Sequence, residues 1–203
     1  MTEESGTLHT RDKILYAAVR LFSERGYKKV TMRDIGWAVG VKAPSIYNYF
    51  ASKKDLLTSI YSFYAQNWKQ VAPDIDALMP LVETIASPLE LLPELFFRYP
   101  PGLEEVMDSI IVFAAREINT DSDSERFIRE YMFSSTDRLV RPLLLRMAEL
   151  GKIEPLDIDN FIRVIVYFNF GASALHCSPL KLSSEGWSAC TGLLFGMVQP
   201  KGE

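Results

Sequence analysis

Cysteine and histidine are scarce in this 203-residue chain, which holds two of each. Cys177 and Cys190 lack the close spacing of a zinc-binding pair, and His9 and His176 are too few for a histidine-rich metal site. Although His176 and Cys177 are adjacent, neighbouring side chains on a helix point in different directions and cannot act as base and nucleophile. We therefore expect free thiols in a cytoplasmic chain and no metal.

Long apolar segments are also missing. The longest uncharged apolar-rich run, residues 164–175, is interrupted by Asn169 and is too short to cross a bilayer, so no membrane contact is expected. The acidic residues 1–8 do not resemble a secretory signal and are expected to form a disordered lead-in. Because no phosphate-binding glycine loop or dinucleotide fingerprint occurs, we expect no cofactor and no enzymatic activity.

Alternating apolar and polar positions, the pattern of a half-buried strand, are not sustained anywhere, so the sequence predicts an all-α fold. Prolines between residues 73 and 102 predict short helical pieces there, and Pro142 predicts a kink or break. Helical periodicity predicts longer helices over residues 11–27, 31–39, 44–50, 53–72, 103–119, 124–150 and 158–175, and a last one from 183 or 184.

The segment Thr31–Lys53 has the pattern of a helix-turn-helix. Thr31 and Asp34 have the spacing of a capping box, which satisfies free amide groups at a helix start. Gly40 stands where a helix can end in left-handed geometry, and Pro44 suits the first turn of the next helix. Two helices joined by such a tight turn can present the second helix to a DNA major groove.

The second of these helices divides into two faces. Ile46 and Phe50 lie on its expected inner side. We assign Lys42, Ser45 and Asn48 to base edges, with Ala43 able to touch a thymine methyl group. Phosphates, which fix the register without reading sequence, are assigned to Thr31, Arg33, Tyr47, Tyr49 and Lys53.

In this region the chain resembles the DNA-binding domain of TetR-family transcriptional regulators. The resemblance covers about a quarter of the chain and implies an operator-binding regulator that pairs through its last two long helices. Gly36 departs from the pattern, since the family usually has alanine there, and glycine costs a helix about 1 kcal/mol. The matching positions are Phe22, Gly26, Tyr27, Thr31, Ile35, Gly40, Val41, Ile46, Tyr47, Tyr49, Phe50, Lys53, Leu56 and Leu57.

Charge is unevenly distributed along the chain. The net charge is −4, but residues 1–60 hold ten Lys or Arg against six Asp or Glu, whereas residues 61–203 hold twelve against twenty. Positive charge therefore gathers around the helix-turn-helix, as expected for a phosphate-facing module. We expect a three-helix DNA-binding domain at 9–52 and a larger helical effector-binding and dimerisation domain at 53–203.

The middle of the chain is rich in aromatic residues, which is typical of a core and also of a ligand pocket. Arg116 lies next to an apolar helix face and could meet an anionic ligand, or it could be a solvated residue at a helix end. The candidate ligand-binding residues are Tyr64, Trp68, Phe97, Phe113, Arg116, Tyr131, Tyr167, Asn169 and His176.

The last two helices favour self-association. Residues 158–175 carry two apolar stripes, one through Ile158 and Ile162 and a second through Tyr167 and Gly171, and one chain's core normally covers only one stripe. A four-helix interface with two-fold symmetry would cover the other, and a fully internal helix pair in a monomer is the alternative. The candidate dimer residues are Phe161, Val164, Ile165, Phe168, Trp187, Ser188, Gly192, Phe195 and Gly196.

These patterns and the resemblance to the TetR family together predict a homodimeric transcriptional regulator, most simply a repressor, that binds a pseudo-palindromic double-stranded DNA operator and is released by a small-molecule effector. A constitutive helical DNA-binding or adaptor protein with a solidly packed central domain remains an alternative. A third possibility, an all-helical enzyme fused to a DNA-binding module, would turn over a bound compound.

Overall fold

The structure is a computed structural model that describes residues 9–85, 90, 99–153, 157–176, 186, 189–190 and 193. All regular elements in these residues are helices, as the sequence predicts. The helices are α1 (Thr10–Arg25), η1 (Tyr27–Lys29), α2 (Met32–Val39), α3 (Ala43–Ile46), α4 (Lys53–Val71), α5 (Ile75–Thr84), α6 (Glu104–Glu117), α7 (Ser122–Ile128), η4 (Arg129–Ser134), α8 (Ser135–Glu149) and α9 (Ile158–His176).

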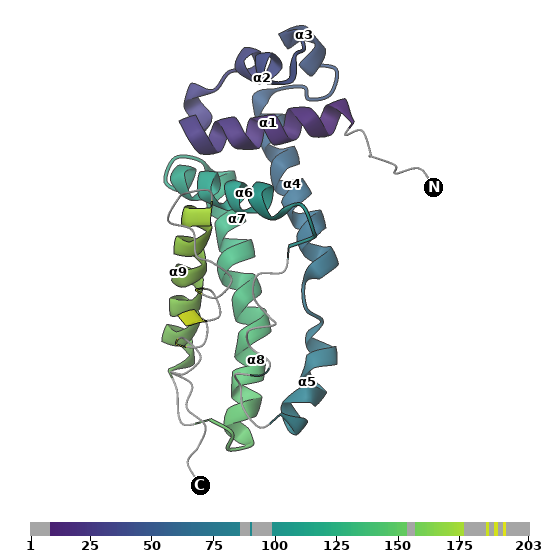
Figure 1. Cartoon of the computed structure of the whole chain (residues 1–203). Helices are drawn as coiled ribbons and strands as arrows, with labels where there is room; N and C mark the ends of the chain where they lie inside the picture. The colour runs from purple at the N-terminus through teal and green to yellow at the C-terminus, as the bar shows by residue number, and fades with distance from the viewer. Residues whose placement is uncertain are drawn as a thin grey trace, which may run out of the picture.

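The first three α-helices form a unit at one end of the molecule (Figure 1). Ile14, Ala18 and Phe22 lie on one face of α1 and are fully buried, which fits the amphipathic pattern of the sequence. The helix ends before Gly26, whose φ of 85° suits a residue without a side chain.

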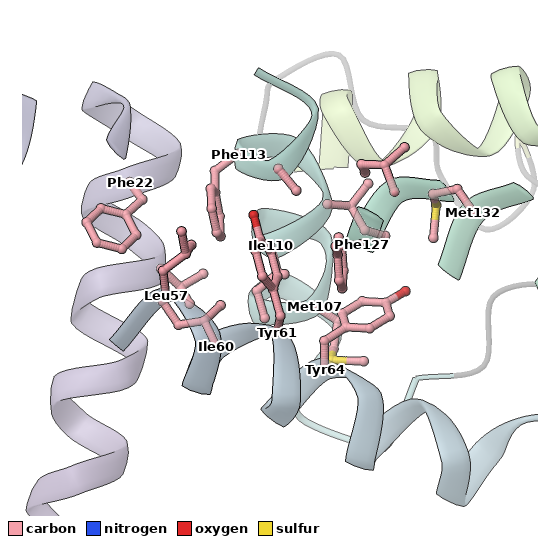
Figure 2. Packing of buried hydrophobic residues seen from close by; sticks show 14 of the residues in the cluster. Phe22, Leu57, Ile60, Tyr61, Tyr64, Met107, Ile110, Phe113, Phe127 and Met132 are labelled. Carbon is pink, nitrogen blue, oxygen red and sulfur yellow. The ribbon is translucent and has the colours of Figure 1, made fainter. Parts of the chain in front are cut away.

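Helix α4 leaves this unit and runs into the rest of the molecule (Figure 1). One aromatic series joins the two parts, since Phe22 of α1 meets Phe113 of α6, with ring centroids 5.7 Å apart. Phe113 stacks on Tyr61 of α4 at 5.7 Å, and Tyr61 stacks on Phe127 of α7 at 4.5 Å (Figure 2). The hydrophobic core is therefore continuous from the N-terminal unit into the larger domain.

The predicted helix 124–150 is uninterrupted at Pro142, which lies inside α8. The irregularity comes earlier, in the π-helical turn η4. The hydroxyl groups of Ser135 and Thr136 donate to the carbonyl oxygens of Tyr131 and Met132, at 2.5 and 2.7 Å, and so satisfy acceptors of this widened turn. Pro80 likewise lies within α5 and does not end it.

Helix α9 buries one of its two apolar stripes. Phe161, Ile162 and Ile165 are at most 5% exposed, and α9 packs on α6 and α8. Val164 is 38% exposed and Tyr167 is 65% exposed, so the second stripe faces outward. This corrects the assignment of Phe161 and Ile165 to a dimer interface, because both belong to the chain's own core.

Candidate nucleic-acid interface

Helix α2 begins with the predicted capping box. The Thr31 hydroxyl group accepts a hydrogen bond from the Asp34 amide at 3.2 Å, and the Thr31 amide donates to the Asp34 carboxylate at 2.8 Å. The Thr31 hydroxyl also donates to the same carboxylate at 2.6 Å. These bonds lower the pKa of Asp34, which is therefore ionised at neutral pH. Since both Thr31 donors are used here, its first role is to fix the start of α2.

The turn after α2 explains the unexpected glycine. Gly40 adopts left-handed geometry (φ 74°, ψ 23°), as the sequence predicts. A Cβ atom at Gly36 would lie 2.7 Å from the carbonyl oxygen of Val41 and 3.4 Å from the amide of Ala43. Only glycine therefore allows this close approach of the turn, which positions α3 against α2.

Helix α3 is short, and residues 47–49 continue it as turns. Pro44 lies in its first turn, and Ile46 and Phe50 are buried, as predicted. Ala43 and Ser45 are half-buried beside the turn. The residues that face solvent are Lys42, Pro44, Tyr47, Asn48 and Tyr49. Buried apolar residues thus anchor this segment while its amine, phenol and amide groups remain accessible.

Lys53 has a different environment from the one expected of a phosphate ligand. Its ammonium group donates to the carbonyl oxygens of Tyr27 and Val30 at 2.8 and 2.9 Å and lies 4.2 Å from the centre of the Tyr27 ring. Burial lowers its pKa. Lys53 therefore ties η1 to the start of α4, and a phosphate would have to share this group through its third donor.

Trp37 is a surface residue that the sequence did not single out. It is 67% exposed on α2, and the guanidinium group of Arg33 lies 4.7 Å from the centre of its ring. The two residues are four positions apart and so share one helix face. A large aromatic side chain that is exposed stands out on a protein surface. The signal available in the sequence for this surface residue was a tryptophan within the amphipathic helix-turn-helix.

Residues 14–60 match the family model described as "Bacterial regulatory proteins, tetR family". This match covers most of α1, all of α2 and α3, and the first part of α4. Residues 14–60 belong to the tetR family of bacterial regulatory proteins.

The curated relatives that this chain resembles are transcriptional regulators. The HTH-type transcriptional repressor KstR2 of Mycolicibacterium smegmatis is 27% identical over 103 residues, which are 51% of this chain and 47% of that protein. This chain thus aligns with about half the length of that relative. KstR2 of Mycobacterium tuberculosis is 27% identical over 163 residues, covering 76% of this chain and 75% of KstR2.

Solved structures support the fold of this chain. The structure of the ketosteroid transcriptional regulator KstR2 of Mycobacterium tuberculosis has a TM-score of 0.64 at 22% identity and covers 98% of both chains. AibR in complex with isovaleryl coenzyme A and operator DNA has a TM-score of 0.58 at 17% identity, covering 92% of this chain and 98% of AibR. None of the described helices of the chain is both long and apolar enough to cross a membrane.

The larger domain of the chain contains a cleft of about 270 Å³ between α4 and the α7–η4 segment. Tyr131, one of the candidate ligand residues, lines it together with Tyr61 and Phe127. Tyr64 is fully buried among the rings of Trp68, Phe127 and Tyr131. Burial raises its pKa, and the charge of Asp108 adds to this effect, so its hydroxyl group stays neutral.

Several other candidate ligand residues have positions that sequence periodicity could not reveal. Phe113 is core between the two domains. Arg116 is exposed and donates to the carbonyl oxygen of Ser23 in α1, so we move it from the ligand set to the contact between domains. Tyr167 moves to the outer stripe of α9. Trp68 and Asn169 are half-buried, and Phe97 and the side chain of His176 lie outside the described residues.

Proposed function

We propose that this chain is a ligand-responsive transcriptional repressor that acts in the cytoplasm as a homodimer on a pseudo-palindromic operator. The observation that carries the proposal is the α2–α3 unit, in which a capped helix, a left-handed glycine and two buried anchors hold an accessible polar segment. The match to the tetR family over residues 14–60 and the repressors among the relatives support the same function.

In this proposal, α3 and the following turns enter the major groove. Lys42, Ser45 and Asn48 read base edges, and Ala43 contacts a thymine methyl group. Tyr47 and Tyr49 are 53% and 43% exposed and donate their hydroxyl groups to phosphates. Thr31, Arg33 and Lys53 support the backbone contact, with Thr31 and Lys53 acting chiefly through the local structure that they fix.

Trp37 and Arg33 form a second phosphate contact in this proposal, because the indole N–H and the guanidinium group are both donors on one exposed face. We expect Trp37→Ala to weaken binding about two- to fivefold on every duplex, since an exposed cation–π pair contributes about 0.5–1 kcal/mol and phosphate contacts carry no sequence information. Fluorescence anisotropy with an operator and an unrelated duplex measures this.

Leu81→Ala is the matched control for that change, because Leu81 is another exposed large apolar residue, 46% exposed on α5. We expect this variant to bind both duplexes as the wild type does. A loss confined to the operator would contradict the phosphate role of Trp37 and indicate a base contact.

The dimer interface in this proposal is the outer stripe of α9. Val164 and Tyr167 are exposed, and a Cβ atom at Gly171 would meet no other atom within 4 Å, so a second helix can approach closely. The partner of this stripe would be the same stripe of a second copy, together with the last helix. The candidate residues Trp187, Ser188, Gly192, Phe195 and Gly196 of that helix lie outside the described residues.

The effector site in this proposal lies in the larger domain, at the cleft beside Tyr131. A ligand releases the operator only if it binds the DNA-incompetent state more tightly than the competent one. Stabilisation of the protein against heat by small metabolites would identify such a ligand, because binding to the native state raises the unfolding temperature.

Selection of duplexes from a random pool tests DNA binding. We expect the purified chain to enrich an inverted repeat whose half-sites are about one helical turn apart, or a multiple of one turn, because a symmetric dimer reads two equivalent half-sites. Enrichment of no duplex at low salt would contradict the proposed function.

A further inference from the structure

A single corner of the larger domain contacts the DNA-binding domain at several points. This corner, residues 116–124, comprises the end of α6 and the start of α7. Arg116 donates to the carbonyl oxygen of Ser23 near the end of α1. The carboxylate of Glu117 accepts from the Tyr27 amide of η1 at 3.1 Å. The corner therefore holds the point where α1 ends and the next segment begins.

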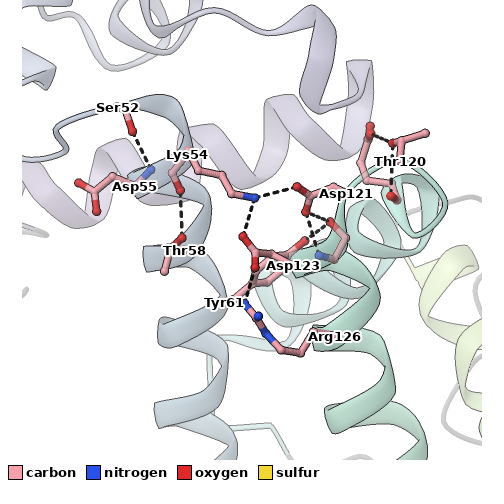
Figure 3. Close-up of polar contacts among 11 residues, drawn as sticks. Ser52, Lys54, Asp55, Thr58, Tyr61, Thr120, Asp121, Asp123 and Arg126 are labelled. Atoms are coloured by element: carbon pink, nitrogen blue, oxygen red, sulfur yellow. Dashed lines mark hydrogen bonds and ion pairs between the residues drawn. The ribbon is translucent and has the colours of Figure 1, made fainter.

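The same corner holds the start of α4 through Lys54. The Lys54 ammonium group lies 2.8 Å from Asp121 Oδ1 and 2.5 Å from Asp123 Oδ2 (Figure 3). Seven residues further along α4, the buried Tyr61 hydroxyl group lies 2.7 Å from the hydroxyl oxygen of Ser124. Two positions on α4, the end of α1 and the start of η1 thus meet nine consecutive residues of the corner.

The carboxylates that receive Lys54 are held in place by other bonds. Asp121 caps α7 by accepting from the Ser124 amide at 2.9 Å and from its hydroxyl group at 2.8 Å. Asp123 also pairs with Arg126 (Figure 3). Their side chains are 16% and 18% exposed, whereas that of Lys54 is 50% exposed. A half-exposed lysine at the start of α4 therefore meets two carboxylates that other bonds hold in place.

Both sides of this contact are charged at neutral pH. Burial acts to lower the pKa of Lys54. The hydrogen bonds to Asp121 and Asp123 outweigh this effect, so the pKa of Lys54 is raised. Burial likewise acts against ionisation of Asp121, and the bonds from Lys54 and Ser124 outweigh it and lower its pKa.

We infer that Lys54 is a positioning residue for operator recognition, and that its ion pairs with Asp121 and Asp123 set the angle between the first turn of α4, which directly follows the DNA-binding domain, and the rest of the larger domain. This inference rests on the proposed function. In a dimer, that angle on each chain fixes the separation of the two α3 segments. If this separation differs from the spacing of the operator half-sites, binding to the second half-site is weakened. Loss of the ion pairs should therefore lower both affinity and selectivity for half-site spacing.

A competing explanation is that Lys54 itself contacts a phosphate. That role predicts a smaller salt dependence of binding when Lys54 is neutralised, with the slope of log K against log salt concentration reduced by about one. It also predicts that neutralising Asp121 and Asp123 tightens binding, because two negative charges near DNA disappear. The positioning role predicts the opposite effect for the two aspartates.

The experiment compares Lys54→Met, the double variant Asp121→Asn with Asp123→Asn, and the triple combination, all as full chains. Asparagine retains an oxygen that can cap α7. Affinity is measured on an operator selected by the wild type and on the same operator with one base pair added between the half-sites. Lys54→Arg serves as the charge-conserving control, and the unfolding temperature of each variant checks that it is folded.

We expect Lys54→Met and the double aspartate variant each to weaken operator binding about three- to tenfold, and the triple variant to be no weaker than either. All three should discriminate less against the longer spacer, with an unchanged salt slope, and Lys54→Arg should bind as the wild type does. Tighter binding by the double variant, or a reduced salt slope with Lys54→Met, would overturn the positioning role. Wild-type affinity in every variant would also overturn it, whereas a wild type that selects no duplex contradicts the proposed function itself.

Discussion

Replacing Gly36 with alanine is expected to reduce operator affinity at least tenfold. The new Cβ atom would lie 2.7 Å from the carbonyl oxygen of Val41, and a backbone atom cannot move aside without moving the turn. Alanine gains about 1 kcal/mol in helix propensity, but overpacking of a tight contact costs about 1–3 kcal/mol. The turn and α3 must therefore shift relative to α2, which misplaces the side chains that face DNA.

Anisotropy titration with the selected operator measures this effect, and thermal unfolding measures its cost in stability. Gly40→Asn is the matched control, because asparagine tolerates left-handed geometry and no atom lies within 4 Å of a Cβ at Gly40. We expect the control to retain operator affinity. Full affinity together with a raised unfolding temperature in Gly36→Ala would show that helix propensity outweighs the contact, and would contradict this account of the turn.

Replacing Tyr167 with glutamate is expected to convert the proposed dimer to a monomer and to weaken operator binding on the order of a hundredfold or more. Tyr167 is 65% exposed on the outer stripe of α9. In the proposed two-fold interface the substitution introduces one charge on each chain, and desolvation of these charges opposes association. Without the partner, a single α3 must bind alone and the gain from linked half-sites is lost.

Analytical ultracentrifugation at micromolar concentration measures the association state, and anisotropy measures binding. Leu81→Glu introduces the same charge at an exposed leucine of α5, on the opposite side of α8 from α9 (Figure 1). This control should remain dimeric and bind DNA normally. A Tyr167→Glu protein that stays dimeric would rule out the outer stripe of α9 as the interface.

The helix-turn-helix could be predicted in detail because its determinants are close together in sequence. A cap needs residues three apart, as Thr31 and Asp34 are, and left-handed geometry is a property of Gly40 itself. The two faces of the following segment also follow from spacing alone, with Ile46 and Phe50 buried. Local signals of this kind depend little on the rest of the fold.

The predictions that needed revision concern contacts between distant residues. Arg116 and its partner Ser23 are 93 residues apart, and Lys53 bonds to a carbonyl 26 residues away, so neither partner can be read from spacing. The two apolar stripes of α9 were recognised, but only packing on α6 and α8 decides which one is buried. For the same reason Gly36 could be explained only by the distance to the following turn.

In the proposed function, two copies of this chain bind one duplex through their N-terminal helices. Native mass spectrometry of the purified chain mixed with its selected operator at low salt tests it most directly. We expect the dominant complex to contain two chains per duplex, and an operator with one half-site scrambled to lose most of this complex. A chain that stays monomeric at micromolar concentration and leaves the duplex unbound would contradict the account.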